Sequence, residues 1–292
     1  MPTPEIGALR RTLTDEIVHA LGFSKTGFWR KALAPLLWFP SDRVARFGSA
    51  FEEQVVKHGF RAAAVWAVEP FVHNILVSGE ENIPREGPLL IASNHPGSID
   101  GLAIAAQLPR DDFRAIVSSI PFIQYLPTAS RHMIFTTLDP HSRMRALREA
   151  IRHLQENGTL LLFPSGVLDP DPALLPGAGE ALDRWSDSIS LILQRVPDTQ
   201  VVVTIVSGVL ESRFWHNPLT HLAEEFWKRQ RLAEFIQTIQ QILLPGRIQL
   251  MPRLTFDQPL NAQQLLLSQE RRFATQTLIQ RARALMDSQR SA

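Results

Sequence analysis

Cysteine is absent from this sequence of 292 residues. That absence excludes disulfides, thiolate metal ligands and a cysteine nucleophile, and it fits a reducing compartment. Long apolar runs are absent too: no stretch approaches the roughly 18–20 residues that cross a bilayer, and ALAPLLWF at 32–39 is short and interrupted by Pro35. The first residues mix acids, prolines and bases, unlike a signal peptide. We therefore expect a cytoplasmic protein that is soluble or lies peripherally on a membrane surface.

An excess of one charge is also absent, because 30 basic residues balance 29 acidic ones and leave a formal net charge of +1. Nucleic-acid-binding proteins usually carry a basic excess, so we expect no nucleic-acid partner. We interpret His216 and His221 as surface residues rather than ligands, and we expect no metal site. What is present is an ordinary globular composition, with 45% hydrophobic and 20% charged residues.

The hydrophobic pattern changes once along the chain. About the first 75 residues have helical patterns, for example Leu9, Leu13, Ile17 and Leu21 at four-residue spacing. The polar stretch GEENIPREGP at 79–88 is a candidate boundary because glycine and proline interrupt regular structure. The pattern predicts a helical N-terminal region at 1–78, an α/β domain at 79–260 and a C-terminal helix at 261–292.

After residue 79, short apolar runs alternate with helical stretches. The clearest helix is 141–156, with Met144, Leu147, Ile151 and Leu154 on one face, Asp139 as its cap and Pro140 in the first helical position. This alternation predicts an α/β fold, a mostly parallel mixed sheet flanked by helices and preceded by a helical N-terminal region. The candidate strands are 88–93, 113–118, 132–137, 159–163, 200–206 and 247–256.

One stretch, LLIASNHPGSIDG at 89–101, places a histidine just after a strand. Ligands bind beyond the carboxyl ends of parallel strands, so His95 lies where a site is expected. Ser98 can cap the following helix, and Asp100 falls in its first turn. A carboxylate that binds one imidazole nitrogen leaves the other nitrogen basic, and such a pair can take a proton from an alcohol. Alternatively, His95 only ends the strand and Asp100 only interacts with the helix dipole.

Three blocks, taken in order, resemble the glycerolipid acyltransferase family, which includes glycerol-3-phosphate and lysophosphatidate acyltransferases. Asn94, His95 and Asp100 match its Asn-His-x4-Asp motif. GTLLLFPSG at 158–166 looks like the family's strand that ends in Phe-Pro-Glu-Gly, and TQVVVTIVSG at 199–208 looks like the strand after it. RIQLMPRLTFDQPL at 247–260 is a weaker match.

The resemblance implies an acyltransferase of phospholipid biosynthesis. His95 would be the general base on the acceptor hydroxyl, and Asp100 would orient it. The donor would be an acyl thioester of coenzyme A or acyl carrier protein, which is a co-substrate rather than a cofactor, and the acceptor glycerol 3-phosphate or lysophosphatidate. The same motifs give candidate substrate-binding residues: Asn94, Ser98, Phe163, Pro164, Ser165 and Gly166.

The chain also departs from the family pattern. Ser165 replaces the usual glutamate, although Pro-Ser-Gly resembles the soluble plastid-type glycerol-3-phosphate acyltransferases. Their following arginines are missing from 167–172, and Leu138 lies near the place of a strand-end arginine that binds phosphate in the family. The candidate substitutes, at a helix N-terminus that favours anions, are His141, Arg143 and Arg145. Alternatively, Arg145, Arg148 and Arg152 are one solvated helix face.

Two later segments allow more than one interpretation. The segment 219–243 combines apolar residues at near-helical spacing with Lys228, Arg229 and Arg231, so it is either a membrane-surface helix or a core-packing helix. Its apolar residues are Leu222, Phe226, Phe235, Ile236, Ile239 and Ile242. The C-terminal helix is typical of a lid or packing helix and carries Arg271, Arg272, Arg281 and Arg283.

Other functions remain open at this point. A lipid hydrolase could use the same His95 and Asp100 with water or with Ser98 or Ser165, but no Gly-x-Ser-x-Gly motif occurs. An acyltransferase for a non-phosphorylated or non-glycerol acceptor is a further alternative. A lipid-binding protein without activity is disfavoured because both motif residues are present.

Overall fold

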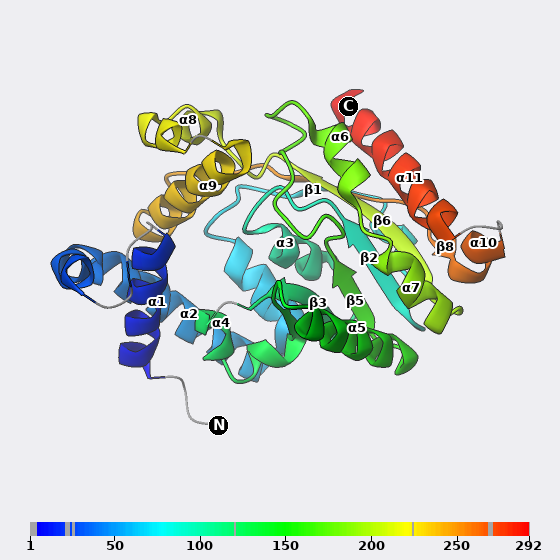
Figure 1. The fold of residues 1–292 in the computed structure, drawn as a ribbon, viewed down its shortest axis with the longest axis horizontal. Coiled ribbons are helices and arrows are strands. Elements are labelled where there is room, and N and C mark those ends of the chain that lie inside the picture. Colours follow the sequence, from blue (N-terminus) through cyan, green and yellow to red (C-terminus); the bar gives the residue numbers. More distant parts are fainter. Residues whose placement is uncertain are drawn as a thin grey trace.

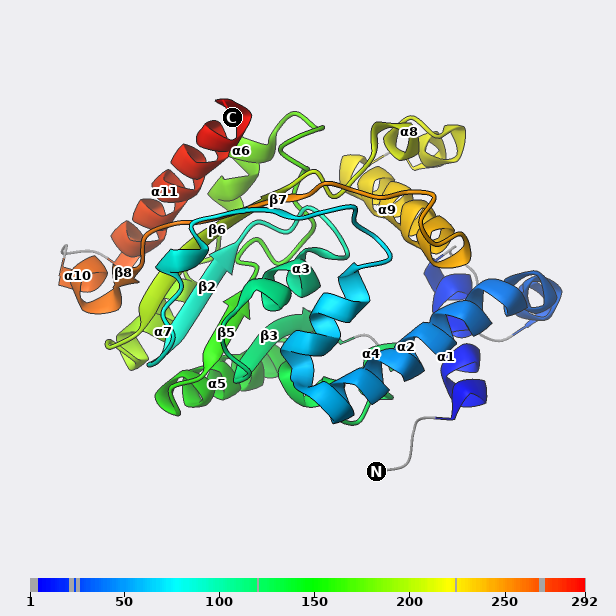
Figure 2. The same cartoon turned by 180° about the vertical axis from the view of Figure 1, so that it is seen from behind.

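The computed structural model describes residues 5–291 except 21–23, 25–26, 120, 224 and 268–270. The described chain forms one sheet with helices on both faces (Figures 1 and 2). Its strands are β1 (Leu76–Ser78), β2 (Leu89–Ser93), β3 (Phe113–Ser118), β4 (Met133–Thr136), β5 (Thr159–Leu162), β6 (Gln200–Ser207), β7 (Arg253–Phe256) and β8 (Leu260–Asn261).

The longer helices cover both faces of this sheet. The α-helices are α1 (Ile6–Ala20), α2 (Phe28–Val68), α3 (Asp100–Gln107), α4 (Pro121–Gln124), α5 (Pro140–Gln155), α6 (Ala178–Ala181), α7 (Ser188–Arg195), α8 (Ser212–Trp215), α9 (Phe226–Leu243), α10 (Ala262–Leu267) and α11 (Arg271–Ser291). Short 3₁₀ turns are η1 (Glu80–Asn82), η2 (Ala129–His132), η3 (Leu182–Arg184) and η4 (Pro218–Leu222).

The sheet is mixed and mostly parallel, as the sequence predicts. Its strand order is β1-β7-β6-β2-β5-β3-β4, and β8 pairs with β6. The pairs of β2 with β5 and β6, of β3 with β4 and β5, and of β1 with β7 are parallel, whereas β6 is antiparallel to β7 and β8. β2 is therefore a central strand, and its carboxyl end is the position at which a ligand site is expected.

The two faces of the sheet bury different helices because side chains alternate along each strand. From β2, Leu89 and Ile91 pack into one core with α1, α2 and α3. Leu90 and Ala92 pack into the opposite core with α5, α7, α10 and α11. Both layers are visible when Figure 1 and Figure 2 are compared, and β2, buried on both faces, is an uninterrupted apolar run for this reason.

The predicted helical N-terminal region is confirmed by α1 and α2, although Leu21 lies outside the described residues. α2 continues through Pro35 and Pro40, so the apolar stretch at 32–39 is helical rather than interrupted. The helical path breaks at Gly59, which has φ 82°, a left-handed conformation that glycine adopts without strain. No helix in the described part of the chain is long and apolar enough to span a membrane.

Most predicted elements occur within a residue or two of their expected bounds. The cap of α5 is confirmed: Asp139 accepts a hydrogen bond from the Ser142 N–H at 2.8 Å, and Pro140 begins the helix. Its predicted apolar face is wrong at Met144, which is exposed because Ala146, Ala150 and Leu154 face the sheet instead.

Three other differences concern the β-strands and the domain bounds. Of the predicted strand 247–256, only 253–256 is a strand, and two short strands, β1 and β8, are additional. The division into three parts stays a prediction; its boundary at residue 79 follows directly on β1, which pairs with β7. The C-terminal region consists of α10 and α11, with residues 268–270 between them outside the description.

Candidate active site

The backbone after β2 is fixed by Asn94, which follows the last residue of the strand. Its side-chain amide donates to the Val206 carbonyl and its side-chain oxygen accepts from the Val206 N–H, both at 2.8 Å. Asn94 is buried, so these two bonds join the carboxyl end of β2 to the neighbouring β6. The chain then turns through Pro96 and Gly97 and enters α3 at Asp100.

The turn brings the two predicted catalytic side chains together. His95 Nδ1 lies 2.8 Å from Asp100 Oδ2. Asp100 is buried, and its carboxylate also accepts from the Gly97 N–H at 3.1 Å and from the Gly101 N–H at 2.6 Å. Because the carboxylate only accepts, Nδ1 carries the proton and Nε2 keeps its lone pair. The histidine side chain is 29% exposed, so this lone pair is open to a substrate.

The electrostatic surroundings raise the pKa of His95 above its usual value. Burial alone would lower it, but the charge of Asp100 and its hydrogen bond to the ring outweigh burial, and Glu234 and Asp169 add to the effect. A negative neighbour stabilises the protonated ring. His95 is thus a stronger base than an exposed histidine.

The second motif block forms the wall beside His95. The Phe163 ring stacks on the imidazole, with centroids 4.3 Å apart and planes at 19°. The Pro164 carbonyl accepts a hydrogen bond from the Ser186 N–H, and the Phe163 carbonyl accepts one from the Gly166 N–H, which forms a turn. Ser165 donates toward Asp169 Oδ2 at 3.1 Å and the Val167 carbonyl at 2.9 Å, so its hydroxyl is bound within its own loop.

Asp169 connects this loop to the His95 backbone. Its carboxylate accepts from the His95 N–H at 3.0 Å, and its own N–H donates to the His95 carbonyl at 2.7 Å. Burial raises the pKa of this carboxyl, although its hydrogen bonds act in the opposite direction. Arg184, at the end of η3, donates to Asp169 Oδ1 at 3.2 Å, and half of its side chain remains exposed.

Helix α9 supplies residues that the motif analysis does not include. Glu234 Oε2 accepts from the Ser98 hydroxyl at 3.0 Å, and the Gln230 side-chain amide donates to the carbonyls of Pro96 and Asp169. The expectation that Ser98 caps α3 is wrong: Ile99 is in the cap position without a side-chain bond, because the Ser98 hydroxyl is turned toward Glu234.

The predicted phosphate-binding residues lie on α5, a helix that begins after β4 and not after β2. His141, Arg143 and Arg145 are exposed on α5, which follows β4 at the sheet edge. β5 and β3 lie between β4 and β2, and strands are spaced by about 4.8 Å. The N-terminus of α5 is already occupied by the Asp139 carboxylate.

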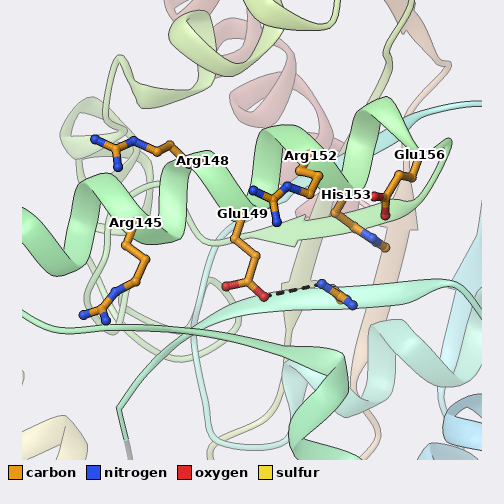
Figure 3. A pocket seen from close by; sticks show the side chains of 7 residues that line it. Arg145, Arg148, Glu149, Arg152, His153 and Glu156 are labelled. Carbon is orange, nitrogen blue, oxygen red and sulfur yellow. Dashed lines mark hydrogen bonds and ion pairs between the residues drawn. The ribbon is translucent and has the colours of Figure 1, made fainter.

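The arginines further along α5 surround a hollow of about 460 Å³ (Figure 3). Arg145, Arg148 and Arg152 line it, and Arg114 at the start of β3 pairs with Glu149 at 3.4 Å. His153, which also lines it, binds the Thr159 carbonyl at the amino end of β5. The hollow therefore extends toward the amino ends of the parallel strands, whereas His95 follows the carboxyl end of β2. Its exposed arginines fit a solvated helix face.

A segment of the chain that includes His95 and Asp100 is similar to known proteins. Residues 74–202 match the family model Acyltransferase. This segment, which is less than half of the chain, is similar to the acyltransferase family. The predicted resemblance to an acyltransferase family is thereby confirmed for the segment that contains Asn94, His95 and Asp100.

Two relatives illustrate the extent of the similarity. Human lysophosphatidylcholine acyltransferase 2 is 30% identical over 111 residues, which are 36% of this chain and 20% of the human protein. The chain thus spans about a fifth of the length of that curated relative. The crystal structure of the 1-acyl-sn-glycerophosphate acyltransferase PlsC of Thermotoga maritima superposes with a TM-score of 0.46 at 17% identity and covers 95% of both chains.

The acyltransferase segment includes His95, Asp100, the second motif block and Arg184, but it ends at residue 202. Gln230 and Glu234 lie beyond it. The sequence signal for these two residues is a row of polar residues at helical spacing in 226–243. Glutamines and glutamates at such spacing are typical of a solvated helix face, so the sequence alone does not assign them to the site.

Proposed function

We propose that this protein transfers a fatty acyl group from a thioester of coenzyme A or acyl carrier protein to a hydroxyl of glycerol 3-phosphate or lysophosphatidate. The observation that carries the proposal is the 2.8 Å contact of His95 Nδ1 with the buried Asp100, at the carboxyl end of a central strand in an acyltransferase segment.

The reaction follows from this geometry. His95 Nε2 takes the proton of the acceptor hydroxyl while its oxygen attacks the thioester carbonyl carbon. Asp100 stabilises the imidazolium that forms. The tetrahedral intermediate then collapses, its carbon–sulfur bond breaks, and the leaving thiolate takes the proton back from His95. The products are the acylated acceptor and a free thiol, and no acyl-enzyme is formed.

The hydroxyl groups near His95 support direct transfer rather than a serine nucleophile. A nucleophilic serine is activated by a hydrogen bond to the base. Ser98 donates to Glu234 and Ser165 donates within its loop, and neither hydroxyl has a hydrogen bond to His95. The hydrolase alternative would therefore depend on water alone.

For the acceptor phosphate we propose Arg184, in addition to the α5 candidates His141, Arg143 and Arg145. Arg184 is linked to the His95 backbone through Asp169, and its half-exposed guanidinium keeps donors for an anion. α5 begins directly after β4, which is three strands away from β2 in the sheet. Asn94 fixes the backbone that carries the base, Phe163 stacks on its ring, and we propose that Ser98, Pro164, Ser165 and Gly166 also belong to the substrate-binding site.

We further propose that the protein works peripherally on a membrane, where lipid substrates lie. Exposed aromatic side chains support this proposal: Phe226, Trp227 and Phe235 on α9 are each more than a third exposed, beside Lys228 and Arg231. The core-packing interpretation holds for other residues of the segment, because Ile236 and Ile242 pack against buried clusters.

The test is release of free thiol from long-chain acyl-coenzyme A and from acylated acyl carrier protein. Acceptors are glycerol 3-phosphate, lysophosphatidate, other lysophospholipids and water. We expect acceptor-dependent thiol release with an acylated glycerolipid product. Equal release with water alone would indicate a hydrolase, and a preference for acceptors without a free phosphate would overturn the assignment of the acceptor.

A further inference from the structure

The buried face of α9 is polar. Gln230, Glu234, Gln237 and Gln241 follow each other at helical spacing, and each is at most 3% exposed. All four bond other segments of the chain: Gln237 donates to the Val209 carbonyl and accepts from the Glu211 N–H, and Gln241 donates to two carbonyls, of Phe71 and Ile248. Buried polar groups are costly unless they are bonded, so α9 is held in place by these contacts.

Two members of this face hold the turn that carries His95. Gln230 donates to the Pro96 carbonyl at 3.1 Å, and Glu234 Oε2 accepts from Ser98 at 3.0 Å. Between them lies Gly97, where an added Cβ would be 2.4 Å from Glu234 Oε1 and 2.7 Å from the Val209 side chain. The turn thus packs directly on the Glu234 carboxyl.

The same turn supports Asp100. The Gly97 N–H donates to Asp100 Oδ2, the oxygen that also binds His95 Nδ1. A displacement of Gly97 would therefore change the contact that orients the base. The Glu234 carboxyl lies against Gly97 on the other side of the turn. A change at Glu234 would therefore let Gly97 move and would alter the contact between His95 and Asp100.

Burial favours the neutral form of Glu234. Burial and the nearby charge of Asp100 raise the pKa of Glu234 to about 8, Asp171 adds to this, and His95 and the Ser98 hydrogen bond oppose it. Its Oε1 has no hydrogen-bond partner among the described residues. A carboxyl with this pKa is mostly protonated at neutral pH, so the neutral amide of a glutamine resembles it in shape and charge.

We propose that Glu234 is a positioning residue for acyl transfer: it fixes the Pro96–Ser98 turn and thereby the contact between His95 and Asp100. α9 is then part of the active site although it lies outside the acyltransferase segment. This inference rests on the proposed function for its kinetic part, whereas the effect on the His95–Asp100 contact can be measured without any substrate.

The kinetic test compares Glu234→Ala, Glu234→Gln and the control Gln237→Ala. Gln237 is equally buried on the same helix and makes two hydrogen bonds, but it does not contact the turn. We expect Glu234→Ala to lower kcat roughly tenfold with little change in the KM of the thioester. Glu234→Gln keeps an acceptor for Ser98 and should recover most of kcat, and Gln237→Ala should stay within about twofold of wild type.

The second measurement is an NMR titration of the His95 ring in wild type, Glu234→Ala and Glu234→Gln. The contact with Asp100 raises the pKa of His95, so a turn displaced by Glu234→Ala should weaken that contact and make the ring titrate at lower pH. Glu234→Gln should titrate like the wild type. An unchanged pKa of His95 in Glu234→Ala, or a kcat loss in Glu234→Ala no larger than in Gln237→Ala, would overturn the inference. Absence of thiol release from the wild type would instead overturn the proposed function, and the titration would still decide whether Glu234 positions the turn.

Discussion

Helix α5 buries two alanines and a leucine, together with a serine and a histidine, and exposes four arginines, whereas α9 buries three glutamines and a glutamate and exposes three aromatic side chains. α5 packs against the apolar face of the sheet, so its solvated face is its charged one (Figure 1). α9 packs over backbone at the ends of loops, where free N–H and carbonyl groups need partners.

The two helices show that the chemistry of a helix's buried face depends on the surface that the helix covers. Over a sheet the buried side must be apolar, and the pattern can be interpreted from the sequence. Over loop backbone the buried side must supply hydrogen bonds, and the same pattern then suggests the wrong face. It follows that the arginines of α5 are conspicuous but belong to a helix that begins after β4, and that Gln230 and Glu234 of α9 are inconspicuous but contact the turn of His95. The predictions below test this division.

The largest effect is expected at the turn that α9 holds. His95→Ala removes the proton acceptor without removing core volume, so transfer should fall by about a thousandfold, within the usual contribution of a general base. The unfolding midpoint should change little. Steady-state thiol release and thermal unfolding measure both quantities. His216→Ala, which removes an exposed histidine after α8, is the control and should behave as wild type. Turnover near wild type in His95→Ala would contradict the mechanism.

The next effect concerns Asp100, whose charge keeps the pKa of His95 raised. Transfer needs the neutral imidazole, so activity should rise with pH through a pKa above the ordinary histidine value. Asp100→Asn removes the negative charge, so the pKa falls and the acid limb of kcat/KM moves to lower pH. The plateau should fall by about a hundredfold, less than in His95→Ala, because the base remains but loses its orienting partner.

The control for this profile lies on α5. Asp139→Asn changes a carboxylate that caps the helix, and asparagine caps a helix equally well. Its acid limb should coincide with that of the wild type. An acid limb that stays in place in Asp100→Asn would show that another group titrates.

A smaller effect, on the acceptor KM, should show whether Arg184 or the α5 arginines bind the acceptor phosphate. If Arg184 binds the acceptor phosphate, Arg184→Ala should raise the acceptor KM roughly tenfold, the equivalent of one hydrogen bond to a charged group, and leave the thioester KM unchanged. Arg143→Ala and Arg145→Ala provide the comparison on α5. A rise in these two variants but not in Arg184→Ala would restore the α5 assignment, and unchanged acceptor kinetics in all three would favour an acceptor without phosphate.

Much of this architecture could be predicted because it depends on local patterns. Apolar runs between turn residues identified the central strands, and the motif around His95 and Asp100 gave the pair that the structure joins. The three-residue strand β1 could not be identified, since its pairing with β7 depends on distant sequence. The contact between Ser98 and Glu234 spans 136 positions along the chain, and no local pattern specifies it. Arg184 likewise reaches the site only through folding, by way of Asp169.

The smallest effect is expected at the membrane, and it compares the outer faces of the two helices. We expect reversible binding to vesicles of anionic lipid, weakened by salt because charges in water are screened beyond about 10 Å at 0.1 M. Arg231→Gln on α9 should weaken binding about fivefold, since a basic residue near an anionic surface is worth about 1 kcal/mol. Trp227→Ala should weaken it further in high salt, where the apolar part of binding remains. Arg148→Gln on α5 is the matched control and should have no effect. Co-sedimentation with vesicles that does not depend on salt, or no co-sedimentation at all, would contradict peripheral binding. A loss of vesicle binding in Arg148→Gln alone would indicate that the α5 side of the protein faces the membrane.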